Sequence, residues 1–145
     1  LGLDVGISYN EENFAEVIKE ITHSHGVDVV LDVIGAPYWR DNLSALAECG
    51  RMVIVGTLGG SKLEVNLGML MAKRAQIRGT LLRGRSIEEK ISLTQKFSSR
   101  ILPLFEDQSL TPIIDSEYSI LEIAIAHHYM ESNANFGKII IHHID

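Results

Sequence analysis

The order of apolar patterns along the chain is the feature that most constrains its fold. Short runs rich in Val, Ile and Leu alternate with longer stretches in which apolar residues recur every three or four positions. The short runs predict buried strands, and the longer stretches predict amphipathic helices. Up to residue 105 a strand is followed by a helix four times. This order predicts a parallel sheet with right-handed helical crossovers and helices on both of its faces.

Capping and helix-breaking residues set the expected boundaries. We expect Asn10 to cap the first helix, Gly50 to end the second, and Pro103 to end or kink the longest one. The expected strands are residues 5–8, 27–33, 51–55, 76–82 and 137–141. The expected helices are residues 10–24, 37–48, 66–74, 87–105 and 119–132, with a short extended segment at 110–114.

Composition excludes several classes of protein. The chain has 145 residues, 46% of them hydrophobic and 22% charged, and its formal net charge is -6. The acidic balance argues against a nucleic-acid surface, which needs clustered Lys and Arg. No apolar run approaches the roughly 18 residues of a membrane span. Cys49 is the single cysteine and cannot form an internal disulfide, which favours a reducing, cytoplasmic location.

The start of the sequence resembles the middle of a domain. The first residue is Leu1, and a predicted strand follows almost at once with no earlier element to pair with it. We therefore expect a chain that is truncated at its N-terminus. A complete protein whose initiator Met and leader were removed remains the alternative.

Ligands of open parallel sheets bind where the strands end at their carboxyl side, and glycines gather there in this sequence. Neither a G-x-G-x-x-G turn nor a phosphate-binding P-loop is present. Asp32 ends a buried strand, and we expect it to brace the loop at Gly35 rather than to act as a general base. The pairs His127–His128 and His142–His143 are adjacent residues that point in different directions, so they do not predict a metal site. Cys49 has no activating neighbour in sequence, which favours a structural thiol over a nucleophile.

Two segments carry a resemblance to a known family. They are Val-Asp-Val-Val-Leu-Asp-Val-Ile-Gly-Ala-Pro-Tyr-Trp at 27–39 and Leu-Ala-Glu-Cys-Gly-Arg-Met-Val-Ile-Val-Gly at 46–56. The chain resembles the medium-chain dehydrogenase/reductase superfamily. Within it, the chain is most similar to the zinc-free NADPH-dependent quinone oxidoreductases, the group with zeta-crystallin and the p53-inducible quinone reductase. Supporting stretches lie at 7–12, 79–85, 126–132 and 135–139.

The resemblance implies an α/β fold with a partial Rossmann-type, doubly wound parallel sheet. Residues 1–109 would form a truncated cofactor-binding domain. Residues 110–145 would form a helix–strand segment that returns to a catalytic domain, most of which is absent from this sequence. The strand, glycine-rich turn and helix that hold the pyrophosphate in the family would also be absent.

The resemblance also implies NADPH as the cofactor, no catalytic residue in this chain and no metal ligand. Tyr9 matches a residue near the 2′-phosphate, and no acid stands beside it, which favours NADPH over NAD. The loop after residues 51–55 would run under the nicotinamide ribose, residues 81–83 would meet the carboxamide, and Asn135 with Phe136 would cover the cofactor. The implied cofactor-binding residues are Tyr9, Val55, Gly56, Thr57, Leu58, Leu81, Leu82, Arg83 and Asn135.

The implied activity is hydride transfer from NADPH to a small-molecule quinone or activated alkene. The isolated chain is expected to be inactive and to bind NADPH weakly or not at all, because the pyrophosphate anchor is missing. A homodimer would form through the edge strand that runs from Gln76 to Leu82. Two other interpretations stay open. One is a fragment of an enoyl reductase or zinc alcohol dehydrogenase, and the other is a non-catalytic module that dimerises through the sheet edge.

Overall fold

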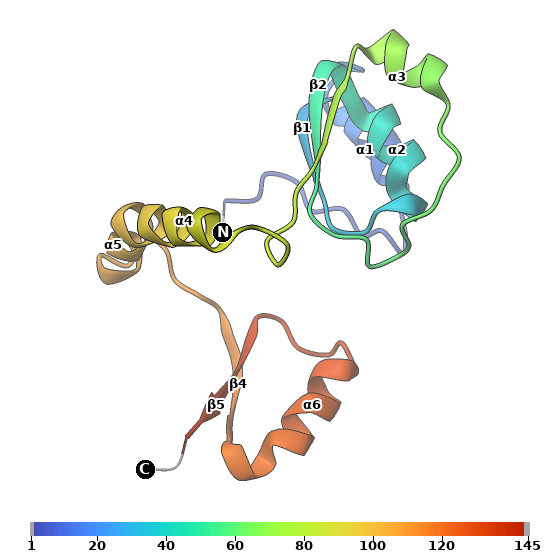
Figure 1. Ribbon diagram of the computed structural model, residues 1–145. Helices are drawn as coiled ribbons and strands as arrows, with labels where there is room; N and C mark the ends of the chain where they lie inside the picture. Colours follow the sequence, from blue (N-terminus) through green and yellow to red (C-terminus); the bar gives the residue numbers. More distant parts are fainter. Residues whose placement is uncertain (1, 144–145) are drawn as a thin grey trace. The chain divides into compact units, whose positions relative to one another are not determined.

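The computed structural model describes residues 2–143, which form two compact units (Figure 1). The first unit ends at Arg85 and the second begins at Ser86. The domain boundary expected between residues 109 and 110 refers to the complete fold of the family and stays a prediction.

The first unit contains a parallel three-stranded sheet, as the alternating pattern predicted. Its strands are β1 (Val27–Asp32), β2 (Leu46–Ile54) and β3 (Gln76–Gly79), and β2 lies in the middle. Both strand pairs are parallel. The mixed α/β class with a parallel sheet is therefore confirmed.

One face of this sheet carries the core of the unit. The buried side chains of Leu43, Leu46 and Met52 form its centre. Leu43 comes from α2 (Trp39–Ala45), and side chains of α3 (Leu67–Lys73) pack against the same cluster. The core is therefore built between β2 and two helices.

The opposite face of the sheet is open. Side chains alternate between the two faces along a strand, and those of Val29 and Leu31 on β1 are 53% and 69% exposed. Val33 and Val55, just beyond the ends of β1 and β2, are also exposed. The expectation of helices on both faces concerns the complete fold of the family and stays a prediction.

The first expected strand and helix differ from the structure. Residues 5–8 form no strand and pair with no other strand within the described range. The first helix is α1 (Phe14–Ile21), and Asn13 caps it by accepting from the backbone N–H groups of Ala15 and Glu16. Asn10 precedes this cap and lies in a turn. The cap therefore lies three residues later than expected.

The second helix ends earlier than expected. A short 3₁₀ turn, η1 (Ala36–Tyr38), leads into α2, which stops at Ala45 because Leu46 is already extended. The ammonium of Lys73 donates to the backbone carbonyls of Ser44 and Leu46. This cation satisfies the carboxyl end of the helix, a role that the sequence had suggested for Gly50.

The second unit holds the remaining elements (Figure 1). They are α4 (Ile87–Arg100), α5 (Leu102–Glu106), β4 (Ile114–Ser119), η2 (Ile120–Glu122), α6 (Ile123–Glu131) and β5 (Lys138–His142). The long helix expected at 87–105 is interrupted at Ile101, which agrees with the break expected near Pro103. Strands β4 and β5 form a separate parallel pair connected by α6.

Among the helices of residues 2–143, none combines the length and the apolar character that a bilayer crossing needs.

Candidate functional site

The loops that follow β1 and β2 form the candidate site. Parallel strands end at one edge of a sheet, so these loops are neighbours. Backbone hydrogen bonds join them at several points, from Leu58 N to Val33 O (3.2 Å), from Gly59 N to Ile34 O (2.9 Å) and from Ala36 N to Gly60 O (2.9 Å). The two loops are therefore one hydrogen-bonded structure rather than two independent segments.

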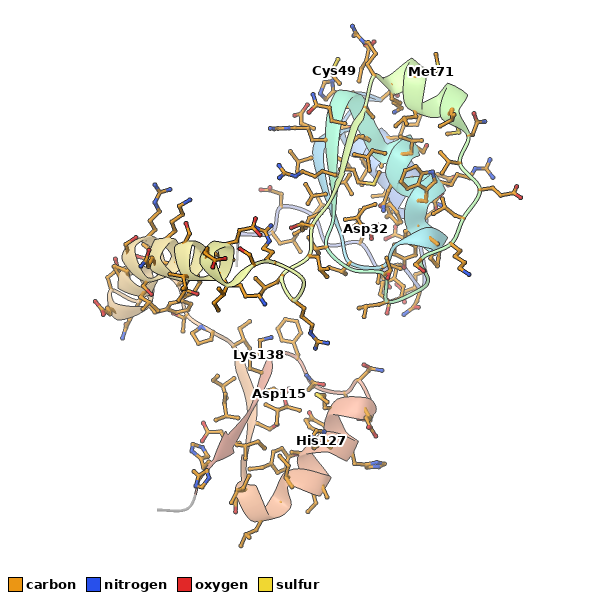
Figure 2. The ribbon with its side chains drawn as sticks, in the orientation of Figure 1. Asp32, Cys49, Met71, Asp115, His127 and Lys138 are labelled. Atoms are coloured by element: carbon orange, nitrogen blue, oxygen red, sulfur yellow. The ribbon has the colours of Figure 1, made fainter. Side chains whose placement is uncertain are left out.

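Asp32 holds the first of these loops. Its side chain is 4% exposed, and its Oδ1 accepts from the backbone N–H groups of Ile34 (2.8 Å) and Gly35 (3.1 Å). Figure 2 shows Asp32 at the end of the strands where the loops close. The expectation that Asp32 braces the loop at Gly35 is confirmed.

Gly35 allows the two loops to approach closely. Its φ is +88°, and an added Cβ would lie 2.6 Å from the carbonyl oxygen of Gly60. A side chain would therefore meet both an unfavourable backbone conformation and a backbone atom. The absence of a side chain at Gly35 therefore lets the loop after β1 pack against Thr57 and Gly60 of the loop after β2.

The residues expected under the nicotinamide ribose lie in the loop after β2. Val55 is 40% exposed and Leu58 is 84% exposed, and Thr57 is also exposed. Gly60 N donates to Thr57 O (3.0 Å), which closes a turn at the tip of the loop. Val55, Gly56, Thr57 and Leu58 are thus contiguous, accessible and joined to the Asp32 loop.

The residues expected near the carboxamide lie beyond β3 rather than within it. The strand ends at Gly79, so the strand expected at 76–82 is too long. Leu81 and Leu82 are 65% and 58% exposed. Arg85 holds this segment by donating from Nε to Leu81 O (2.9 Å) and from Nη2 to Thr80 Oγ1 (3.0 Å). Arg83 lies in the same turn and makes its own interaction with the protein.

Tyr9 and Asn135 lie away from these loops in the sequence. Tyr9 is 70% exposed and stands in a turn, not at the end of a strand. Asn135 belongs to the second unit, where its side-chain amide donates to Gly137 O (3.2 Å). Asn135 is half-buried.

An open hollow of about 550 Å³ adjoins the loop cluster. It contains a cation that the sequence analysis did not single out, Lys62, two residues beyond Gly60. A Lys directly after a glycine-rich loop was the signal that could have identified it. The hollow is lined by Ala36, Pro37, Gly59, Gly60, Ser61, Lys62 and Leu63.

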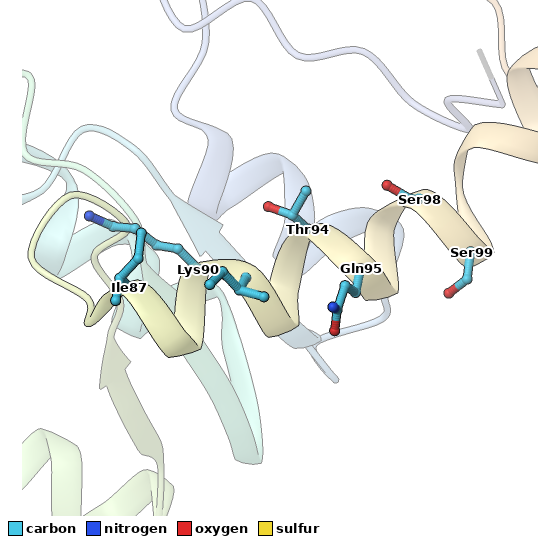
Figure 3. Close-up of a pocket in the computed structure, with 7 residues that line it drawn as sticks. Ile87, Lys90, Thr94, Gln95, Ser98 and Ser99 are labelled. Atoms are coloured by element: carbon cyan, nitrogen blue, oxygen red, sulfur yellow. The ribbon is translucent and has the colours of Figure 1, made fainter.

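A hollow of about 640 Å³ lies along α4 in the second unit (Figure 3). Apart from one Lys, its lining consists of apolar, hydroxyl and amide side chains, so it contains no acid–base pair. Although this hollow is larger than the one that contains Lys62, volume alone does not make it the better candidate for an active site. It is lined by Ile87, Lys90, Ile91, Thr94, Gln95, Ser98 and Ser99.

Within residues 2–143, no three His, Cys, Asp or Glu side chains come together as a metal site would require. The described residues therefore do not fit a zinc ion, and no chemistry of this chain is derived through one.

Known proteins resemble this chain over almost all of its length. The bovine (Bos taurus) quinone oxidoreductase-like protein 2 is 25% identical over 140 residues, which cover 97% of this chain and 40% of that protein. The human (Homo sapiens) quinone oxidoreductase is 27% identical over 135 residues, covering 92% and 39%. The chain thus spans about 40% of the length of these curated relatives.

Solved structures agree in fold. A mycobacterial quinone oxidoreductase superposes with a TM-score of 0.74 at 22% identity, covering 95% of this chain and 42% of that one. An NAD-dependent alcohol dehydrogenase gives 0.72 at 21% identity, covering 97% and 38%. A mycobacterial protein complexed with NADPH gives 0.70 at 26% identity, covering 97% and 44%.

These comparisons confirm the resemblance to quinone oxidoreductases and the partial Rossmann-type fold. The narrower assignment to the zinc-free, NADPH-dependent group stays a prediction. The zinc-binding dehydrogenase family matches residues 1–141, almost the whole sequence. The chain therefore belongs to the zinc-binding dehydrogenase family.

Proposed function

We propose that this chain is the C-terminal part of an NADPH:quinone oxidoreductase, an enzyme that transfers hydride from NADPH to a quinone or activated alkene. Its family and its quinone oxidoreductase relatives support an oxidoreductase. The observation that carries the proposal is the pair of hydrogen-bonded loops at the carboxyl ends of β1 and β2. Nicotinamide cofactors bind at this edge of a parallel sheet.

The proposed roles follow the order of the loops along the sheet edge. Thr57 offers a hydroxyl to the nicotinamide ribose, while Val55, Gly56 and Leu58 supply backbone and apolar surface beneath it. The turn with Leu81, Leu82 and Arg83 meets the carboxamide. Tyr9 lies near the 2′-phosphate, and Asn135 covers the cofactor.

The bound reduced nicotinamide supplies the hydride, and the protein supplies orientation and exclusion of water. We assign no proton transfer to a side chain of this chain. Asp32 acts through the backbone, because both of its close donors are backbone N–H groups. Its role is to keep the Gly35 loop in a shape that leaves room for the cofactor.

The isolated chain should bind NADPH weakly and should not turn over. Pyrophosphate binding in this fold depends on a glycine-rich turn that opens a helix, and the sequence contains no such turn. The remaining contacts concern the nicotinamide half of the cofactor. We expect affinity in the millimolar range, where the free energy of binding is only about 4 kcal/mol.

A titration of the ¹⁵N-labelled chain with NADPH tests the binding part of the proposal. We expect amide shifts at residues 33–36 and 55–60, with NADH as the matched ligand that lacks the 2′-phosphate. Shifts scattered over residues outside the proposed cofactor-binding set, or none at these loops, would contradict the proposed site.

A chimera tests the reaction. The N-terminal part of the human quinone oxidoreductase, up to the start of the matched region, is joined to this chain. We expect NADPH oxidation that depends on an ortho- or para-quinone, with the N-terminal part alone as the control. A folded chimera that oxidises no NADPH with any of several quinones would reject the enzyme assignment.

We also propose a cytoplasmic homodimer. Strand β3 lies at the edge of the three-stranded sheet, where unpaired backbone groups can pair with a second copy. The single thiol, Cys49, is free, as in proteins of reducing compartments. Light scattering on the chain with and without NADPH separates this enzyme dimer from a purely structural dimer, which would show no response to the cofactor.

A further inference from the structure

Another hollow lies within the first unit, at the edge of the sheet where the strands begin. It has a volume of about 260 Å³ and adjoins Gly26, directly before β1, and Ala45, directly before β2. The loops of the candidate site follow the opposite, carboxyl ends of these strands. In Figure 2, Met71 on α3 and Asp32 mark these two ends of the unit. This amino-edge hollow is therefore separate from the candidate site.

Basic and hydroxyl-bearing side chains dominate the polar lining of the amino-edge hollow. They are the basic residues Lys19, His25 and Lys73 and the serines Ser24 and Ser44. Among the described residues that line the hollow there is no Asp or Glu. Ammonium and hydroxyl groups donate hydrogen bonds, and charged donors form strong hydrogen bonds with phosphate oxygens. The lining therefore favours a small oxyanion.

The Lys73 ammonium is held in a fixed position beside the hollow. It donates to the backbone carbonyls of Ser44 (3.0 Å) and Leu46, where α2 ends. An ammonium group has three N–H donors. Within the described residues these carbonyls account for two of them, which leaves the third for a ligand. A cation that is already ordered loses less conformational freedom on binding than a mobile surface lysine does.

The turn after α1 is also fixed by hydrogen bonds. His23 and Ser24 have φ values of +50° and +69°, in the left-handed region that few residues other than glycine adopt. Ser24 N donates to Lys19 O (2.7 Å), and Gly26 N donates to the hydroxyl of Thr22 (2.9 Å). These bonds hold the turn in its unusual conformation and keep Ser24 beside the hollow.

Two negative features oppose an anion at this place, and both are compensated. Helices α1 and α2 end beside the hollow, and the carboxyl end of a helix carries partial negative charge. Lys73 donates to carbonyls at the end of α2, and the hydroxyl of Thr22 donates to Ile18 O at the end of α1. Asp28 is exposed and pairs with His25 at 3.5 Å. Two full ammonium charges therefore face only partial negative charges.

We propose that the amino-edge hollow binds a phosphate-type oxyanion, held by the ammonium groups of Lys19 and Lys73 and by the two serine hydroxyls. The ligand is inorganic phosphate or the phosphate group of a small monoester, since both present the same oxygen acceptors to these donors. The site goes beyond the proposed function. It lies at the other edge of the sheet and uses none of the residues assigned to the nicotinamide cofactor.

A titration of the ¹⁵N-labelled 145-residue chain with inorganic phosphate tests the site. The pH and the ionic strength are held constant with sodium chloride, because any cationic surface responds to a change in salt. We expect saturable amide shifts at residues 24–26, 44–46 and 73, with a dissociation constant in the millimolar range. Chloride alone, added over the same range of concentration, should not produce them. Equal shifts with chloride would overturn the proposal.

Three variants connect the shifts to the side chains. Lys19→Gln removes one ammonium group and leaves the contacts of Lys73 with α2 in place. We expect it to raise the phosphate dissociation constant about fivefold, the effect of one exposed charge pair. Ser44→Ala, which removes a hydroxyl from the lining, should weaken binding by a smaller factor. Lys96→Gln is the control, since Lys96 is an exposed lysine on α4 and its loss changes the net charge equally.

The outcomes decide between a built site and general attraction of anions. Unchanged affinity in both Lys19→Gln and Ser44→Ala, or an equal loss in Lys96→Gln, overturns the proposal. Amide shifts of β1 and β2 that match the wild-type chain show that each variant is folded. Glycerol 3-phosphate, titrated in parallel, separates the two sources. Tighter binding than inorganic phosphate identifies a monoester site, and weaker binding identifies a site for free phosphate.

Discussion

The carboxylate of Asp32 is nearly buried, and it stabilises the loop in which it lies. It accepts from Ile34 and Gly35 within its own loop, and its backbone carbonyl accepts from Val55 N (2.8 Å), just beyond the end of β2. Its side chain therefore holds the first loop, while its backbone carbonyl connects that loop to the second one. We therefore expect substitution of Asp32 to disturb the loops of the candidate site more than substitution of any other residue there.

Replacing Asp32 by Ala should destabilise the chain. The substitution leaves two backbone donors without their acceptor, at a cost of about 1–3 kcal/mol for each that stays away from water. Urea unfolding followed by circular dichroism measures the change in free energy. Asp28→Ala is the control, since the side chain of Asp28 is 79% exposed and its contact is to His25 on the surface. Equal stability of the two variants would contradict the bracing role.

The Asp115 carboxylate gives the second unit a pH dependence with a definite sign. Its pKa is lowered in the folded protein, chiefly by the bond from Phe136 N. The stabilisation is present above the pKa of the unfolded chain and is lost as the pH falls through the lower pKa of the folded state. A ¹³C titration of the carboxyl carbon measures this pKa. A value at or above that of an ordinary aspartate would refute the expectation.

At the scale of elements, helix α1 shows how capping sets a boundary. The amphipathic pattern begins near residue 10, but the helix starts only where Asn13 can accept from Ala15 and Glu16. Upstream, the backbone of Glu11 and Glu12 turns back to Ser8 O instead. Local backbone hydrogen bonds decide whether Asn10 or Asn13 caps the helix. These bonds cannot be inferred from the pattern of hydrophobic residues.

Asn13→Ala should therefore cost about 1 kcal/mol of stability, the usual contribution of a helix cap. Asn10→Ala should leave stability unchanged, because Asn10 lies outside the helix. The measurement is thermal unfolding monitored by far-ultraviolet circular dichroism. A larger loss for Asn10→Ala than for Asn13→Ala would restore the boundary expected from the sequence alone.

The sequence predicted the presence and type of several helices and strands better than the residues at which they begin and end. Strand β1 and helix α3 agree with the expected segments to within a residue or so, because their apolar periods and caps coincide. Helix α2 ends early where Leu46 becomes extended, and Lys73, 27 residues further along the chain, donates to the Leu46 carbonyl there. For the site, the pattern identified the bracing role of Asp32, whereas the bond from Phe136 to Asp115 joins residues 21 positions apart. Such long-range contacts have no signature in a local pattern.

At the scale of the whole chain, strand β1 stands out for its exposed apolar side chains. Those of Val29 and Leu31 are more exposed than any other large apolar side chain within the described strands. Val29, Leu31 and Val33 follow one another on the open face of β1 and its extension. An apolar patch of this kind usually marks a surface for another protein segment or a tendency to associate. It contrasts with isolated exposed apolar residues elsewhere, which are ordinary in folded proteins.

Leu31→Lys should reduce both the binding of a hydrophobic fluorescent dye and the concentration-dependent association of the chain. Leu121→Lys is the matched control, since Leu121 is 82% exposed and lies in the second unit, on the short turn η2. Dye fluorescence and light scattering measure the two effects. If the two variants reduce association equally, the sheet face is not the surface responsible.

Cys49 gives the chain a practical property. It is the single cysteine, it is exposed, and it lies in the first half of β2, far from the Asp32 loop (Figure 2). A maleimide fluorophore would attach there at one defined position without occupying the glycine-rich loops. The unmodified sequence is thus ready for single-site labelling, so ligand binding can be monitored optically without engineering any other thiol.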